Sequence, residues 1–257
     1  MWKFIRITVL LLVLVGVAGV TWIDKVRTTS WKQTLWVGIF PMNADGRDVS
    51  ERYVRSLTVE DFASIETFFA TEANRYGIPL DRPVRIELYP SPSQKPPVLA
   101  PRSGPLASIW WSLKMRWYAR SAADVPGRAP SHIRVFVLFH DPAVSERVPH
   151  SLGLQKGLVG VVHAFADRSM RGENNIVIAH ETLHTLGATD KYHLDTREPI
   201  YPDGYADPDR SPRFPQAKAE IMAGERPVSA TEQVMPEGLR EEAVGPKTAV
   251  EIGWIKQ

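Results

Sequence analysis

Cysteine is absent from this chain of 257 residues. Without thiol groups the protein can form no disulfide bond, no thiolate zinc site and no cysteine nucleophile. Any metal ion that it binds must therefore be held by histidine and carboxylate side chains. A charge excess is missing as well, because 31 Lys and Arg residues stand against 29 Asp and Glu residues. The resulting net charge of +2 gives no reason to expect nucleic acid as a partner.

Hydrophobic residues make up 44% of the chain, which is enough for a substantial core. At roughly 150 residues per domain, the length allows one large domain or two small ones. No internal repeat is visible in the sequence. We therefore expect a folded globular protein, and the sequence leaves its oligomeric state open.

The N-terminal region contains an uncharged apolar run over residues 7–23. Its 17 residues are just enough to cross a bilayer as a helix. Lys3 and Arg6 precede the run, and Trp2 and Trp22 lie near its two ends, where indole rings prefer the membrane interface. The pattern predicts one N-terminal transmembrane helix.

Residues 1–28 are accordingly predicted to be a membrane anchor, and residues 29–257 to form the functional domain. We expect a short cytoplasmic N-terminus with the domain on the extracytoplasmic side, so that the membrane is a partner through this helix. The alternative is a signal peptide that is cleaved near the small residues 17–19, which would release the domain as a secreted protein.

The domain that follows alternates strand-like with helix-like segments. Strand-like segments occupy residues 33–42, 84–89, 132–139 and 157–165. A helix is predicted from the capping box of Thr58 and Asp61 to Gly77. Six prolines between residues 90 and 105 predict a loop. This order of elements predicts the α/β (α+β) class.

A second helix is predicted over residues 106–122. It combines four aromatic with three basic residues: Trp110, Trp111, Trp117, Tyr118, Lys114, Arg116 and Arg120. An aromatic stripe at helical spacing is usually part of a core, and this is our expectation. The alternative is that the helix rests on a membrane surface, where such side chains are common.

The residues best suited to catalysis lie on a third predicted helix, for which the pair Asn174 and Asn175 is suitable as an N-cap. At 100° per residue His180 and His184 lie about 40° apart on one helix face, so both imidazoles can bind a single ion. A catalytic zinc ion keeps one position for water and lowers the pKa of that water toward 7. Glu181 lies on the same helical turn and can act as the general base. The alternative is a surface helix with two solvated histidines.

Two residues extend this motif toward the C-terminus. Gly187 can end the helix in the left-handed conformation, and Asp190 follows three residues later. With the pattern His-Glu-x-x-His-x-x-Gly-x-x-Asp, the sequence resembles the metzincin clan of zinc metallopeptidases, whose extended motif has a third zinc ligand, His or Asp, at its last position. The resemblance implies one catalytic Zn²⁺ held by His180, His184 and Asp190.

His193 is the alternative third ligand. A helix continued past Gly187 would carry residue 190 about 15 Å along the axis from His180, so the chain has to turn at the glycine. After that turn three residues are enough to bring Asp190 back to the metal, whereas His193 would overshoot. Imidazole is nevertheless the commoner zinc ligand, and this keeps His193 as an alternative.

The resemblance also implies a fold for the remainder of the domain. It predicts a zincin-like mixed sheet, an active-site helix and an irregular C-terminal subdomain, with residues 193–215 as the irregular part and residues 247–255 as a closing helix. Metzincins carry a methionine in a tight turn beneath the zinc. Met222 is the expected turn residue, and Met235 is the weaker candidate.

The run 157–165 would be the edge strand that pairs with the main chain of an extended polypeptide substrate, although it also fits an ordinary buried strand. Tyr192, Tyr201 and Tyr205 are candidates to stabilise an oxyanion. The resemblance thus implies a membrane-anchored zinc endopeptidase with Glu181 as the general base. The alternatives are a zincin-shaped module that binds a partner without turnover, and a zinc hydrolase of a non-peptide amide.

Overall fold

The computed structural model describes residues 28–256 except 100–103 and 156, and before them only residues 2, 4–8, 11, 19 and 26. Most of the predicted membrane segment, residues 7–23, therefore lies outside the described residues. Within the described part of the chain, no helix combines the length and the apolar content that crossing a bilayer requires.

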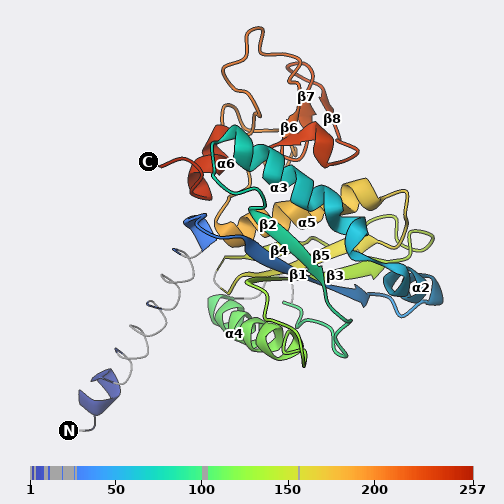
Figure 1. The fold of residues 1–257 in the computed structure, drawn as a ribbon, viewed down its shortest axis with the longest axis vertical. Helices are drawn as coiled ribbons and strands as arrows, with labels where there is room; N and C mark the ends of the chain where they lie inside the picture. The colour runs from blue at the N-terminus through green and yellow to red at the C-terminus, as the bar shows by residue number, and fades with distance from the viewer. Residues whose placement is uncertain are drawn as a thin grey trace.

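A five-stranded mixed sheet forms the centre of the protein (Figure 1). Its strands are β1 (Leu35–Asn43), β2 (Val84–Leu88), β3 (Ile133–His140), β4 (Leu152–Leu154) and β5 (Val159–Phe165). Their order in space is β2-β1-β3-β5-β4. The four longer strands run parallel, and the short edge strand β4 is antiparallel to β5. The predicted α/β class is therefore confirmed.

Helices cover both faces of this sheet, which explains why its central strands are apolar on both sides. Figure 1 shows α3 (Ala63–Arg75) and α5 (Arg171–Leu186) on one face and α4 (Pro105–Ala122) on the other. In β1, Val37 and Ile39 belong to the core beneath α3 and α5, whereas Phe40 and Met42 belong to the core beneath α4. A further helix, α2 (Asp48–Ser56), follows β1.

The capping box predicted at Thr58 is present, because the Asp61 carboxylate accepts a hydrogen bond from the Thr58 backbone N–H at 2.9 Å. The first turn is a 3₁₀ helix, η1 (Val59–Phe62), and the α-helix begins after it. Ile65 and Phe69 are fully buried on one face of α3. Gly77, with φ +70°, ends the helical segment as expected.

The prediction for the edge strand was wrong. β5 lies between β3 and β4 and hydrogen-bonds to both, so the run 157–165 has no free edge. The edge strand on this side of the sheet, β4, has only three residues and was not expected, because an alternating pattern cannot be recognised over so short a segment.

The aromatic side chains of α4 divide between the core and the surface, so the expectation of a core stripe holds only in part. Tyr118 packs into the core beneath the helix together with Met115. Trp110 and Trp117 point outward and are 61% and 76% exposed. The helix therefore has apolar residues on two opposite faces.

The C-terminal part has little regular structure, as expected. Short strands form two pairs, β6 (Ala219–Glu220) with β9 (Glu242–Ala243) and β7 (Arg226–Pro227) with β8 (Gln233–Val234), and η2 (Leu239–Glu241) precedes β9. The closing helix α6 (Pro246–Glu251) is shorter than predicted, because the chain turns at Gly253 with φ +80°. Trp31 donates its indole N–H to the Ile252 carbonyl at 2.7 Å, which joins the two ends of the domain.

Candidate metal centre

Two asparagines fix helix α5 against the rest of the domain. Asn174 forms hydrogen bonds with both the N–H and the C=O of Phe165, at the end of β5. Asn175 donates to the Asp61 carbonyl and to the Ser64 hydroxyl. The prediction that they cap the helix was wrong, because α5 begins one turn earlier, at Arg171. Their side-chain amides instead fix the orientation of the helix about its axis, and this determines where the side chains further along the helix point.

The Nε2 atoms of His180 and His184 both point toward Asp190. The Nδ1 of His180 lies 2.9 Å from the Ile221 carbonyl oxygen, and the Nδ1 of His184 lies 2.8 Å from the Ala188 carbonyl oxygen. Because a carbonyl only accepts, Nδ1 carries the proton in each ring. In the neutral imidazoles each Nε2 then carries the lone pair, which can bind a metal ion in place of a proton.

The chain turns back after α5 and brings Asp190 to these nitrogens. Gly187 ends the helix in the left-handed conformation with φ +108°. The Asp190 Oδ1 lies 3.2 Å from the Nε2 of His180 and 3.2 Å from the Nε2 of His184. Two ligands at about 2.05 Å from a tetrahedral ion are about 3.3 Å apart, so these separations fit a zinc ion. Within the described residues this is the one group of its kind.

The electrostatics of the group favour a cation. Burial alone would raise the pKa of the Asp190 carboxyl, but hydrogen bonds with His180 and His184 hold it far below its usual value. Burial alone would lower the pKa of His184, but its hydrogen bonds with Asp190 and the Ala188 carbonyl raise it instead. Asp190 is therefore ionised at neutral pH and supplies a negative charge at the point where the imidazoles meet.

Glu181 is buried beside this group, with only 5% of its surface exposed. Burial raises the pKa of its carboxyl group, and the two neighbouring histidines oppose the change only partly. Its Oε2 has no hydrogen-bond partner among the residues that the structure describes. A buried carboxylate oxygen without a partner costs stability, and in Glu181 this oxygen lies beside the group formed by His180, His184 and Asp190.

Edge strand β4 lies directly against the same turn of α5. A Cβ atom added to Gly153 would lie 2.4 Å from the Glu181 carbonyl oxygen and 2.6 Å from the His184 Cβ. Only glycine permits so close an approach. The glycine therefore places an open sheet edge next to the candidate metal ligands.

No protein-family model and no curated protein matches this chain. Its function has to be inferred from the site itself.

The loop of Asp190 is held by a residue far along the chain. Glu251, in α6, accepts hydrogen bonds from the Thr189 N–H and hydroxyl and from the Lys191 ammonium, at 2.8 to 3.0 Å. Lys191 is buried and also donates its backbone N–H to the Met222 carbonyl at 2.9 Å. Both neighbours of Asp190 are thus fixed to other elements, although sequence gave no signal for Glu251.

Met222 lies fully buried in a turn over residues 221–223. The residue before it, Ile221, supplies the carbonyl that orients His180, and Met222 itself binds the loop of Asp190. This turn therefore supports the candidate centre from two sides. Met235, by contrast, is 62% exposed and lies next to β8.

Other candidate residues are less close to the centre. His193 is exposed, and its side chain does not join the group formed by the ligand atoms of Asp190 and the two histidines. Burial raises the pKa of Tyr192, and the nearby charges of Asp190 and Glu181 raise it further. Tyr201 and Tyr205 instead pack against each other, with ring centroids 5.2 Å apart. Of the three tyrosines, Tyr192 is the one whose pKa is affected by the charges of Asp190 and Glu181.

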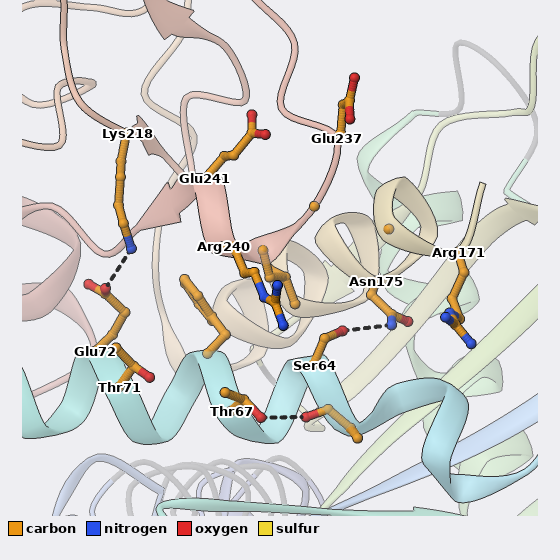
Figure 2. Close-up of a pocket in the computed structure, with 15 residues that line it drawn as sticks. Ser64, Thr67, Thr71, Glu72, Arg171, Asn175, Lys218, Glu237, Arg240 and Glu241 are labelled. Atoms are coloured by element: carbon orange, nitrogen blue, oxygen red, sulfur yellow. Dashed lines mark hydrogen bonds and ion pairs between the residues drawn. The ribbon is translucent and has the colours of Figure 1, made fainter. Parts of the chain in front are cut away.

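A separate pocket of about 680 Å³ lies between α3, the first turn of α5 and residues 237–241 (Figure 2). None of the candidate metal ligands lines it. Figure 2 shows two of its polar pairs, Asn175 with Ser64 and Lys218 with Glu72 at 3.7 Å. The pocket is therefore not part of the candidate metal centre.

Proposed function

We propose that this chain is a zinc-dependent endopeptidase of the metzincin type. His180, His184 and Asp190 would hold one Zn²⁺, and Glu181 would be the general base. One observation carries the proposal: two imidazole Nε2 atoms and one carboxylate oxygen converge beside a buried carboxylate whose Oε2 has no partner among the described residues.

A bound zinc ion would polarise the substrate carbonyl and acidify water in this site. The protein groups have defined roles around it. The carbonyls of Ile221 and Ala188 keep the imidazoles in the tautomer that leaves Nε2 free. Glu181 would accept the proton of the attacking water and return it to the leaving amine nitrogen. Tyr192 is the candidate donor to the oxygen of the reacting carbonyl.

The arrangement around the site supports the metzincin type. An antiparallel edge strand lies beside the helix that carries the motif, and a buried methionine turn follows an irregular segment. We propose that β4, rather than β5, pairs with the main chain of an extended polypeptide substrate, because its outer edge is free among the described strands. Gly153 would then bring that substrate close to Glu181.

For location, we propose that residues 7–23 anchor the chain in a membrane and that the catalytic domain lies outside the cytoplasm. Secretion after cleavage of the same segment is the alternative. Proteolytic protection of the chain in intact cells and the apparent mass of the mature protein distinguish these cases.

The experiment that tests the enzymatic proposal compares the full chain with Glu181→Gln. Both proteins should contain about one zinc ion per chain by mass spectrometry, whereas hydrolysis of a denatured protein should fall by several orders of magnitude in the variant. Failure to bind zinc, or cleavage unchanged by the substitution, would reject the proposal. Activity confined to small non-peptide amides would instead favour an amidohydrolase.

A further inference from the structure

The outer face of α4 carries a continuous apolar stripe. Its members are at least half exposed: Leu106, Ile109, Trp110, Leu113 and Trp117. At 100° per residue they fall within an arc of about 100° over residues 106–117, and Arg120 lies in the same arc in the last turn. Contiguous apolar surface of this kind on a folded domain marks a contact with something outside it.

Basic side chains flank the stripe. Lys114 is exposed and lies about 40° beyond one side of the arc, while the half-buried Arg116 lies about 20° beyond the other. Arg120 is exposed at the C-terminal end. The helix has no acidic residue. The ammonium of Lys114 lies 5.6 Å from the centre of the Trp110 ring. The face therefore suits a partner that is apolar and carries negative charge at its surface.

The opposite side of α4 already has its own contacts. Met115 and Ala119 are buried against the sheet, and the Tyr118 hydroxyl donates to the Gln94 carbonyl at 2.6 Å. The Trp111 indole donates to the Pro97 carbonyl at 2.8 Å. The exposed stripe is thus a second apolar face on a firmly attached helix, and Figure 1 shows that this helix lies across the sheet from α5.

We propose that α4 lies flat on the surface of an anionic lipid bilayer. Tryptophan and leucine side chains would enter the boundary between headgroups and acyl chains, and Lys114 and Arg120 would contact lipid phosphates. The helix is about 27 Å long, so all its exposed apolar residues can contact one plane. Charge complementarity favours lipid over a second copy of the chain, because two such faces would bring like charges together.

The covalent link to the predicted anchor agrees with this orientation. Eleven residues separate the end of the apolar run at residue 23 from the start of β1 at residue 35, and the connection spans at most about 40 Å. A domain held so close to a bilayer gains effective concentration for a weak surface contact. The proposal does not depend on the peptidase activity, since α4 and the metal centre lie on opposite faces of the sheet.

The absence of cysteine makes the test direct, because one introduced thiol gives one labelling site. The full chain with Leu113→Cys carries a nitroxide label on the new thiol. The matched control is Met235→Cys, because Met235 is 62% exposed and lies near β8, away from α4 (Figure 1). Both proteins are incorporated into vesicles of phosphatidylcholine alone or mixed with phosphatidylglycerol. Collision of the label with oxygen is compared with its collision with a water-soluble nickel complex.

We expect the ratio of oxygen to nickel collisions at residue 113 to exceed that at residue 235 several-fold in the anionic vesicles. Lys114→Gln and Arg120→Gln should each lower the ratio of bilayer-bound to unbound α4 by about fivefold. Equal ratios at the two positions in both vesicles would overturn the proposal. Spin coupling between labels at residue 113 in lipid-free protein would also overturn it, in favour of a dimer.

Discussion

The carboxylate of Glu251 lies 2.8 Å from the buried ammonium group of Lys191. The two residues are 60 positions apart, and their ion pair joins helix α6 to the loop that carries Asp190. The same carboxylate binds Thr189 on the other side of Asp190. The proposed third metal ligand is therefore positioned by a residue that has no contact with the metal ligands themselves.

Substitution of Glu251 by Ala should weaken zinc binding by about 10- to 100-fold, because the loop loses three hydrogen bonds and Lys191 is left buried without its carboxylate. Zinc affinity by competition with a chelator measures the effect. Glu232→Ala removes an exposed carboxylate elsewhere and should leave the affinity unchanged. An equal effect of both substitutions would show that Glu251 does not position the loop.

Asp190→Ala should lower zinc affinity by orders of magnitude, whereas His193→Ala should change it far less. The reason is the 3.2 Å approach of Asp190 Oδ1 to both His180 and His184, which the exposed His193 does not share. The same chelator competition ranks the two variants. A larger loss in His193→Ala would assign the third ligand to that histidine.

Gly153→Ala should impair both stability and the proposed activity. Its Cβ would clash with the Glu181 carbonyl oxygen at 2.4 Å, so β4 would have to move away from α5, at a cost of about 1 to 3 kcal/mol. Denaturant unfolding and peptide hydrolysis provide the two measurements. Gly238→Ala is the matched control, since its Cβ would meet one atom, at 3.9 Å, and its φ of −178° suits any residue. Similar losses in both variants would argue against the predicted clash.

Glu242→Gln should stabilise the protein at neutral pH. The side chain is buried, its two carboxylate oxygens lack partners among the described residues, and burial together with the charge of Glu220 raises its pKa well above the usual value. In the unfolded chain the group ionises at its ordinary pKa, so the free energy of unfolding falls as the pH rises beyond that value. The variant should not show this fall.

The expected gain from this substitution is about 1 to 3 kcal/mol at pH 7 and close to zero at pH 4. Thermal unfolding at both values measures it. Glu220→Gln is the contrasting control. The Glu220 carboxylate accepts hydrogen bonds from Met222, Gly245 and Thr248, and an amide has only one acceptor oxygen, so this substitution should destabilise the protein. A gain that is the same at both pH values would contradict the ionisation of Glu242 as its cause.

Regular patterns made much of this structure predictable from sequence. Continuous apolar runs located β1, β3 and β5, because parallel strands between two helical layers are buried on both faces. The edge strand β2 was located instead by its alternation of buried and more exposed residues. The spacing of His180 and His184 depends only on the geometry of a helix. The turn that brings back Asp190 could be predicted because Gly187 readily adopts the left-handed conformation.

Features that depend on contacts between distant segments were not predictable. Helix α2 has only nine residues, of which Ser50 and Val54 are buried, so its apolar side is too short to be recognised in a largely polar sequence. Strand β4 is defined by its pairing with β5 and not by its own sequence. The contacts of Glu251 are with residues about 60 positions away, and no local pattern encodes them.

The dependence of the Asp190 loop on α6 has a consequence for synthesis of the protein. At about 5 to 20 residues per second, a ribosome needs about 3 to 12 s to extend the chain from Lys191 to Glu251, 60 residues later. During that interval the nascent chain contains both histidines and Glu181 but cannot form the contacts that fix their third partner. Translation order thus delays assembly of the centre until the rest of the domain is present.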